Sequence, residues 1–324
     1  MSPHGELTYG QIESAAERIA DGIRRVAVAP ADLGGLSPER AEGSAEVFLA
    51  LEFMQHTGTF KARGALNFLR AQREAETLPG AGVTIASGGN AGLACAWAAG
   101  ALNVPATVFV PATAPPVKVA RLRHYGADVR LAGSQYAEAL SACQRFAATT
   151  GALASHAYDD PLIAAGAGTL LDEIRLQLPD LDTVVVAVGG GGLFSGVATA
   201  AQHHGIQTIA VEPENCRALN AALGAGQVID VTVDSVAADS LGARRVSEMA
   251  LQTAQSATVR SVLVTDLEII AARKALWEHY RLAVEHGAAT ALAGILSPSG
   301  YRPAAGEKIC VILCGANTDP TDLA

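Results

Sequence analysis

The sequence predicts an α/β fold in which helices cover a parallel sheet on both faces. Short apolar segments of strand length recur along the chain, and helical patterns separate most of them. Strands buried on both faces read as continuous apolar runs, and helical crossovers join parallel neighbours. Glycine-rich turns follow three of these segments, at the strand ends where an open α/β sheet places its ligands. We therefore expect a ligand-binding α/β protein.

The expected elements follow in order along the chain. An amphipathic helix is predicted over residues 8–28, because apolar residues return on one face at helical spacing. Residues 30–43 read as a loop, since they are rich in Pro, Gly and Ser. A strand over 47–53 and a helix reaching about Glu76 flank a turn at Thr57–Lys61. Further strands are expected at 83–86, 106–110, 129–131, 184–188, 208–211, 262–264 and 309–313.

Composition excludes several classes of protein. Half of the 324 residues are hydrophobic, 17% are charged and the net charge is −9, which is typical of a globular protein with one large or two ordinary domains. An acidic protein is not attracted to nucleic acid or to an anionic membrane. No apolar run reaches the ~18 residues of a membrane span, and residues 1–10 lack a signal-peptide pattern. The five scattered cysteines contain no Cys-x-x-Cys, so we expect a reduced, cytoplasmic protein.

One lysine stands out among only four in the chain. Lys61 lies between Phe60 and a helical pattern, directly after the turn Thr57-Gly58-Thr59. A lysine that is readily desolvated loses its proton and can form a Schiff base with a carbonyl compound. A surface lysine at the start of a helix would give the same local pattern. The other motifs decide between these two interpretations.

The glycine-rich turns predict anion-binding sites. Ser87-Gly88-Gly89-Asn90-Ala91 follows the strand at 83–86 and opens a helix, and Gly189–Gly192 with Leu193 follows the strand at 184–188. Small residues there let backbone N–H groups approach an anion at a helix N-terminus. A tight turn needs only one glycine, so four in succession favour a phosphate cradle. A third turn, Cys314-Gly315-Ala316-Asn317, follows the last strand.

The identity of the phosphate compound is narrowed by the motifs that are absent. Residues 189–196 do not satisfy the G-x-G-x-x-G of a dinucleotide site, and the chain has no P-loop, H-E-x-x-H, paired C-x-x-C or G-x-S-x-G. Glu212 lies about twenty residues beyond the glycine turn, as a ribose-binding acid would, so a nicotinamide-dependent dehydrogenase stays open as an alternative. A single phosphate and a lysine able to form an imine together favour pyridoxal phosphate.

These motifs, in this order, resemble the fold type II enzymes that use pyridoxal phosphate. The resemblance spans nearly the whole chain and is to the threonine/serine dehydratase (ammonia-lyase) family, with serine racemase as a near relative. It implies a tryptophan synthase β-like fold, with two open twisted α/β domains and the cofactor in the cleft between them. It also implies a large cofactor-binding domain from residues 1–77 and 156–324, a small domain from 78–155 that closes on the substrate, and a homodimer.

The resemblance implies a role for each matching residue. Lys61 would hold the cofactor and act as the base at the substrate α-carbon. Phe60 would lie against the pyridine ring, Asn90 would bond its 3′-oxygen, Cys314 would face its nitrogen and Glu285 would lie near its other face. The phosphate would be bound by the N–H groups of Gly189, Gly190, Gly191, Gly192 and Leu193, and the substrate carboxylate by Ser87, Gly88, Gly89, Asn90 and Ala91. Ser240 would border the substrate pocket.

The activity implied is the α,β-elimination of water from L-threonine, L-serine or both, giving a 2-oxo acid and ammonia, with Lys61 and Ser87 as the catalytic candidates. A thiol at Cys314 would not keep the pyridine nitrogen protonated, so loss of the α-proton is best coupled to departure of the hydroxyl. Alternatives on the same fold are 3-hydroxyaspartate dehydratase, serine racemase and a β-replacing synthase. A non-catalytic carrier of pyridoxal phosphate is the alternative outside the enzymes.

Three departures from the family pattern affect these expectations. Racemases of the group carry a second serine where this chain has Gly88, which has no proton to give, so racemisation is disfavoured. Ala91 replaces a histidine found in many relatives. Metal-using relatives pair the strand-end acid, here Glu212, with an aspartate six residues later, and here that place is Ala218. A divalent Mg²⁺ or Ca²⁺ site at Glu212 is therefore expected to be short of ligand charge, and a monovalent ion is the alternative.

Overall fold

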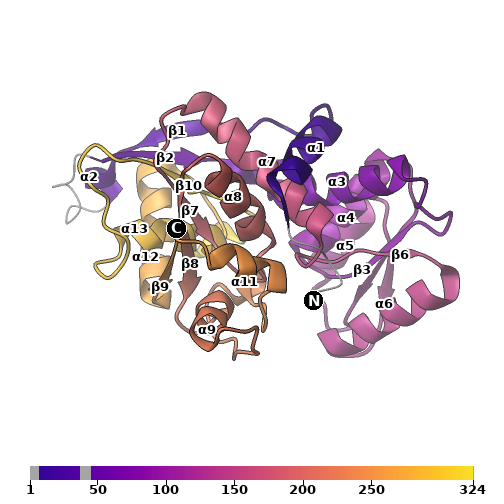
Figure 1. Cartoon of the computed structure of the whole chain (residues 1–324). Coiled ribbons are helices and arrows are strands. Elements are labelled where there is room, and N and C mark those ends of the chain that lie inside the picture. Colours follow the sequence, from indigo (N-terminus) through magenta and orange to yellow (C-terminus); the bar gives the residue numbers. More distant parts are fainter. Residues whose placement is uncertain (1–6, 37–44, 324) are drawn as a thin grey trace.

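The computed structural model describes residues 7–36 and 45–323 and contains two sheets (Figure 1). The larger sheet has six strands in the order β1-β2-β10-β7-β8-β9. Its strands are β1 (Val28–Ala31), β2 (Glu46–Ala50), β10 (Lys308–Ile312), β7 (Thr183–Ala187), β8 (Gln207–Pro213) and β9 (Val259–Val264). All neighbours pair in parallel except β1 and β2, which are antiparallel.

Helices cover both faces of the six-stranded sheet. Every residue of β7 is buried, as the continuous apolar run predicts. On one side lies α8 (Gly192–His203), and on the other lie α12 (Asp266–Tyr280) and α13 (His286–Leu296) (Figure 1). Helices α9 (Ala218–Ala225), α10 (Ala238–Leu241) and α11 (Glu248–Ala254) also belong to this part. The glycine turn at 189–192 thus connects a central strand to a covering helix.

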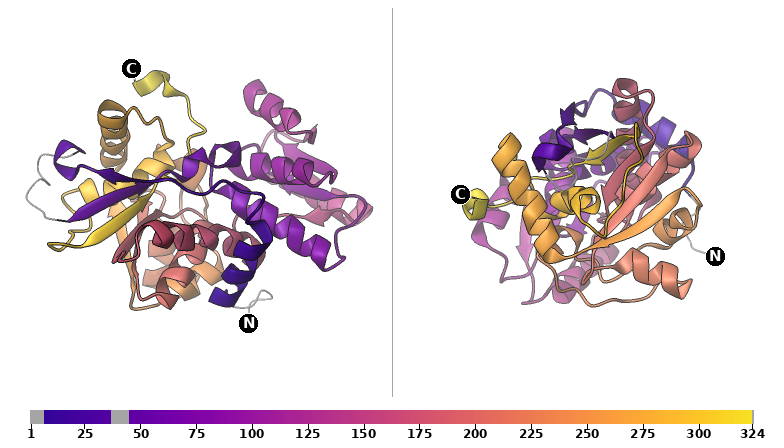
Figure 2. Two further views of the ribbon diagram at one scale, coloured as in Figure 1. Left: turned by 90° about the horizontal axis from the view of Figure 1, so that it is seen from above. Right: turned by 90° about the vertical axis from the view of Figure 1, so that its left-hand side faces the viewer.

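The smaller sheet is parallel throughout. Its strand order is β5-β4-β3-β6, formed by β5 (Asp128–Leu131), β4 (Ala106–Val110), β3 (Val83–Ala86) and β6 (Leu153–Ala154). The helices around it are α4 (Asn90–Ala101), α5 (Pro116–His124) and α6 (Tyr136–Thr150). Figure 2 shows this part as a lobe beside the six-stranded one. The turn at 87–91 therefore belongs to a different sheet from the turn at 189–192.

Helix α3 (Lys61–Glu74) lies at the junction of the two lobes. It packs against α7 (Pro161–Gln177) on one side and against α4 on the other. The contact with α7 is close because glycines replace side chains: a Cβ on Gly64 would lie 2.6 Å from the carbonyl oxygen of Ile163, and one on Gly166 would lie 2.7 Å from that of Arg63. On the other side, Leu66 and Leu69 enter the core formed with α4. Lys61, the first residue of α3, thus stands at this junction.

Several element boundaries differ from the sequence-based expectations. The helix expected over 8–28 is wrong beyond residue 19, because α1 spans only Tyr9–Ile19. The chain turns where Gly22 packs so closely that a Cβ would lie 2.6 Å from the Leu66 side chain. Residues 28–31 then form β1, and 33–36 form the short helix α2 (Leu33–Leu36), where a loop was expected. The rest of that expected loop, 37–43, lies outside the described residues.

The other expected strands are present, most of them with shifted ends. The strand expected over 47–53 ends at Ala50, because Glu52–Met54 forms a 3₁₀ turn. The strands at 83–86 and 106–110 have the predicted bounds. The two-residue strand β6 was not predicted, because so short a segment carries no periodicity. In the described part of the chain, no helix combines the length and apolar character needed to span a bilayer.

Candidate active site

The turn that carries Lys61 is fixed against the loop after β10. Thr57 and Gly58 both adopt left-handed backbone angles, with φ of 62° and 77°. The N–H of Phe60 donates to the carbonyl oxygen of Cys314 at 3.0 Å, and Thr59 forms a β-bridge with Gly315. The motifs around residues 57–61 and 314–317, distant in sequence, are therefore adjacent in space.

The amino group of Lys61 is removed from water. Its Nζ donates to the carbonyl oxygen of Ala157 at 2.7 Å and lies 4.7 Å from the centroid of the Phe60 ring. Burial lowers the pKa of Lys61 to about 8, while Cys314 and Glu285 act in the opposite direction. A small cavity beside Lys61 is also lined by Ala91 and Ala157. This environment makes the amine easier to deprotonate than an ordinary lysine, so a nucleophilic neutral form is more accessible.

The glycine turn presents a row of open amide groups. Within residues 7–36 and 45–323, the N–H groups of Gly190, Gly191, Gly192 and Leu193 donate to no protein acceptor. The carbonyl oxygens of Gly190 and Gly191 point elsewhere, accepting bonds from Ser247 and Ser195. This arrangement at the N-terminus of α8 suits a phosphate.

Side chains would not fit in this turn. A Cβ on Gly190 would lie 2.3 Å from the ring of Tyr158, and one on Gly191, whose φ is 99°, would lie 2.4 Å from Ala250. On Gly192 it would lie 2.9 Å from the Tyr158 carbonyl oxygen, and on Gly189 it would lie 3.0 Å from the backbone of Leu241. The turn is thus held between Tyr158 and the segments at 241–250, which explains the run of glycines.

The loop from Ser87 to Ala91 offers a second set of amides at the start of α4. The hydroxyl of Ser87 accepts from the N–H of Gly89 at 3.3 Å. A Cβ on Gly88 would lie 3.3 Å from Val110, and one on Gly89 would meet nothing within 4 Å. The Gly89 side of the loop is therefore open. Of these residues, Ala91 shares the small cavity with Lys61.

Glu285 brings the Asn90 helix and the Cys314 loop together. The amide of Asn90 donates to both Glu285 oxygens, at 2.9 and 3.0 Å, and the N–H of Asn317 donates to one of them at 2.9 Å. Burial raises the pKa of Glu285, opposed by these hydrogen bonds. Burial likewise raises the pKa of the Cys314 thiol to about 12, so this group is neutral.

Ser240 lies on α10, between the glycine turn and the start of α13. Its hydroxyl oxygen is 2.2 Å from the position of a Cβ on Gly287, and the next residue, Leu241, packs on Gly189. The structure therefore brings together Lys61, the 87–91 loop, Glu285 and Cys314, with Ser240 beside them. Such a set offers an amine, the amides of the 87–91 loop and a neutral thiol.

A family comparison decides the class of protein. Residues 28–315 match the model of a family described as "Pyridoxal-phosphate dependent enzyme". The chain belongs to this family of pyridoxal-phosphate-dependent enzymes. The buried Lys61 amine and the open amides of the glycine turn fit this cofactor, which carries an aldehyde and one phosphate. The predicted cofactor and the fold type II architecture are thereby confirmed.

Curated relatives of this pyridoxal-phosphate enzyme include lyases. It is 36% identical over 316 residues to an L-threonine ammonia-lyase of Geobacter sulfurreducens, covering 97% of this chain and 76% of the relative. It is also 36% identical over 277 residues to a phenylserine dehydratase of Ralstonia pickettii, covering 85% of this chain and 83% of the relative.

Solved structures of similar shape include a racemase as well as a deaminase. A maize serine racemase superposes with a TM-score of 0.89 at 29% identity, covering 98% of this chain and 96% of the other. A processed threonine deaminase from Solanum lycopersicum superposes with a TM-score of 0.87 at 29% identity, covering 99% and 88%. These likenesses support the resemblance inferred from the motifs.

In this pyridoxal-phosphate enzyme, the carboxylate of Glu212 already accepts hydrogen bonds from backbone N–H groups. Its two carboxylate oxygens accept from the N–H groups of Leu219 and Asn220, at 2.7 and 2.8 Å, at the start of α9. Burial raises the pKa of Glu212 to about 8. Ala218 has no oxygen to offer, and among the described residues no three His, Cys, Asp or Glu side chains gather as a metal site would require. This donor set does not fit a divalent cation.

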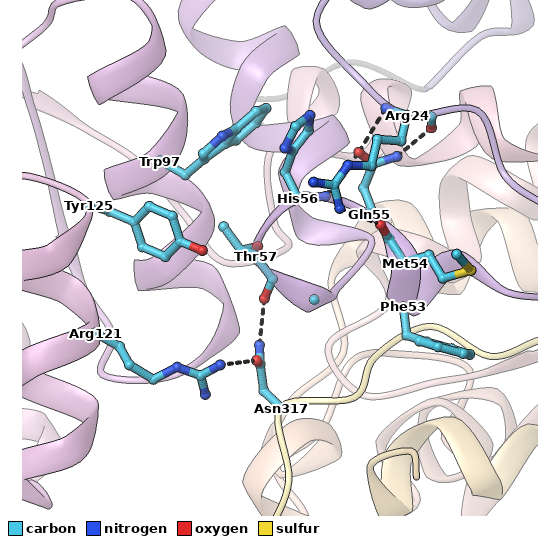
Figure 3. A pocket seen from close by; sticks show the side chains of 11 residues that line it. Arg24, Phe53, Met54, Gln55, His56, Thr57, Trp97, Arg121, Tyr125 and Asn317 are labelled. Atoms are coloured by element: carbon cyan, nitrogen blue, oxygen red, sulfur yellow. Dashed lines mark hydrogen bonds between the residues drawn. The ribbon is translucent and has the colours of Figure 1, made fainter. Parts of the chain in front are cut away.

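A polar cavity of about 460 Å³ lies beside the Thr57–Gly58 turn (Figure 3). Arg24, His56 and Arg121 give it a basic lining, and His56 stacks on Trp97 with ring centroids 4.5 Å apart. Asn317 closes one side of it.

Sequence reasoning assigned no role to several residues of the site. Asn317 belongs to the motif Cys314-Gly315-Ala316-Asn317, but its contacts are with residues distant in sequence and could not be predicted from the motif. Tyr158 and Ala157 carry no local signal, because their importance comes from packing on Gly190 and from the bond to Lys61.

Proposed function

We propose that this protein is a pyridoxal-phosphate-dependent ammonia-lyase acting on a small 3-hydroxy amino acid, L-threonine, L-serine or both. It would release a 2-oxo acid and ammonia. The observation that carries the proposal is the position of the Lys61 amine, desolvated and adjacent to the loop at 87–91. The names of the relatives, a threonine ammonia-lyase and a phenylserine dehydratase, agree with this chemistry on 3-hydroxy amino acids.

The residues that hold the cofactor are inferred from the same geometry. The open N–H groups of Gly190 to Leu193, with Gly189 preceding them, would bind the phosphate, and Lys61 would attach to the aldehyde carbon. Phe60 would lie against the ring, Asn90 would bond the 3′-oxygen, and Cys314 would face the ring nitrogen. A neutral thiol does not protonate that nitrogen, which favours direct elimination. Glu285 would orient Asn90 rather than contact the substrate.

The 87–91 loop would bind the substrate, and Lys61 would act as the base at its α-carbon. The amides at the start of α4, with Ser87, would receive the α-carboxylate, and Ser240 would border the side-chain pocket. Pyridoxal phosphate, when bound, supplies the electron sink for the bond broken at the α-carbon. Lys61 would take the α-proton while the β-hydroxyl departs, so that this proton and the hydroxyl together make up the water that is lost. Hydrolysis of the dehydrated product then consumes one water and gives the 2-oxo acid and ammonia. General bases of this kind typically contribute about 10²- to 10⁴-fold in rate.

Racemisation is the second candidate, because a serine racemase superposes closely on this chain. It requires a proton donor on the face opposite Lys61. The position is Gly88, which has no side chain to donate. Elimination is therefore favoured. 3-Hydroxyaspartate dehydration and β-replacement are the other activities considered on the same fold.

We also infer the domain organisation, the oligomeric state and the cellular location of the protein. Residues 78–155 would act as a small domain closing on the substrate against residues 1–77 and 156–324. The protein would be a homodimer in the cytoplasm. Sedimentation velocity would test the dimer.

A panel of threonine, serine and 3-hydroxyaspartate isomers tests the proposed activity. Oxo-acid and ammonia should form in equal amounts from L-threonine or L-serine. Inversion without ammonia would instead support a racemase, ammonia from 3-hydroxyaspartate alone would support that dehydratase, and no reaction by cofactor-loaded protein would support the carrier.

A further inference from the structure

Asn317 connects four separate segments of the site. Its side-chain amide donates to the carbonyl oxygen of Thr57 and to Oδ1 of Asn90, each at 2.8 Å. Its Oδ1 accepts from Arg121 at 2.9 Å, and its backbone N–H donates to Glu285 at 2.9 Å. Figure 3 shows the bonds to Thr57 and Arg121. Every polar group that the Asn317 side chain offers is thus used.

The contact with Thr57 lies on the segment that carries Lys61. Thr57 has a left-handed backbone, which is uncommon for a residue branched at Cβ. The adjoining Gly58 is packed on the same amide: a Cβ there would lie 3.1 Å from the Oδ1 of Asn317. Since Thr57 lies four residues before Lys61, the amide helps to fix the turn that sets the start of α3.

The contact with Asn90 fixes which way that residue points. Because Oδ1 of Asn90 accepts from Asn317, its Nδ2 is directed at Glu285, to which it donates. Asn90 begins α4, and Arg121 lies on α5, so both belong to the smaller lobe. Asn317 itself follows β10 of the larger sheet. Its hydrogen bonds therefore tie the Lys61 turn to the lobe that carries the 87–91 loop.

We propose that Asn317 is a positioning residue, which sets the orientation of Asn90 and the Thr57–Lys61 turn relative to each other. The inference deepens the proposed function and rests on it. The donor half of the amide performs this role, since it reaches both Thr57 and Asn90. The acceptor half, the Oδ1 of Asn317, would hold only Arg121 at the wall of the cavity and would not contribute to this positioning.

Two variants separate these halves. Asn317→Ala removes both, whereas Asn317→Asp keeps the shape and the acceptor for Arg121 but loses the donor. Asn220→Ala is the matched control, because Asn220 is also half-buried and its amide donates to the Ser261 hydroxyl, away from the site. Three measurements are needed: the dissociation constant for pyridoxal phosphate, kcat and KM separately, and hydrogen exchange of the segments 56–60 and 87–92.

Both Asn317 variants should weaken cofactor binding about tenfold and lower kcat more than they raise KM. Exchange should quicken in both segments, and Asn220→Ala should match the wild type. Full kcat and cofactor affinity in Asn317→Asp would overturn the inference, as would unchanged exchange in Asn317→Ala. If Asn317→Ala does not fold, the cofactor affinity and kcat of Asn317→Asp test the inference without it. A wild type that binds cofactor without forming oxo-acid would defeat the proposed function, while the exchange and affinity results would still judge Asn317.

Discussion

The amino group of Lys61 donates to the carbonyl oxygen of Ala157 at 2.7 Å. Ala157 lies in the segment between β6 and α7, where the chain returns from the smaller lobe. The bond directs the amine into the junction between the lobes rather than toward solvent. To attach to the cofactor, the amine must give up this bond and its proton, which burial makes easy to lose.

The pH dependence of cofactor capture should therefore report the Lys61 amine. Because its pKa is about 8 rather than the usual 10.5, half of the amine is neutral at about pH 8, and about nine-tenths is neutral near pH 9. The rate at which cofactor-free protein takes up pyridoxal phosphate, followed by absorbance, should level off there. A rate still climbing at pH 10 would contradict this environment. The unfolded chain binds more protons between about 8 and 10.5, so this group also makes stability rise with pH in that window.

Gly191→Ala should damage the proposed phosphate cradle. Its φ of 99° disfavours any side chain, and the new Cβ would lie 2.4 Å from Ala250. We expect a lower melting temperature and at least tenfold weaker cofactor binding. Gly226→Ala is the control, since Gly226 has a φ of 67° with nothing within 4 Å. There only the backbone cost of about 1–2 kcal/mol should appear, with cofactor affinity intact. Equal effects from the two variants would show that crowding in the turn is unimportant.

Arg63→Met should destabilise the fold strongly. The guanidinium of Arg63 is fully buried and pairs with Glu52 at 2.7 Å and with Glu173 at 2.8 Å. Removing it leaves Glu52, whose pKa burial already raises, without its cationic partner. The expected loss is about 3–5 kcal/mol in urea unfolding. Adding Glu52→Gln should recover part of it. If Arg63→Met alone lowered the free energy of unfolding by only about 1 kcal/mol, as loss of an exposed ion pair would, the buried pair would not have the importance assigned to it here.

Much of the fold was predictable because its signals are local. Buried parallel strands such as β3 and β4 can be recognised in the sequence as short apolar runs. Glycine-rich turns indicate where several of the strands end. The pairing of β1 with β2 could not be foreseen, because it depends on where the chain turns at Gly22. The bonds of Asn317 are equally hidden, since they join residues 57, 90, 121 and 285 through the tertiary fold. At Glu212, sequence identified a strand-end acid, but only packing reveals that α9 occupies both oxygens.

Chelation should leave the protein unchanged. Because both oxygens of Glu212 cap α9, we expect the same melting temperature with EDTA, Mg²⁺ or Ca²⁺. A wild type that EDTA destabilises by several degrees would mean that a cation does displace the cap.

The absorbance spectrum of the purified protein tests the central assignment most directly. Wild-type protein mixed with pyridoxal phosphate should develop the band of an imine-bound cofactor, and borohydride should fix the label on the peptide that contains Lys61. Lys61→Ala should show neither the band nor the label, and should form no oxo-acid from threonine or serine. A band and label that persist in Lys61→Ala would contradict the account, because another lysine would then hold the cofactor.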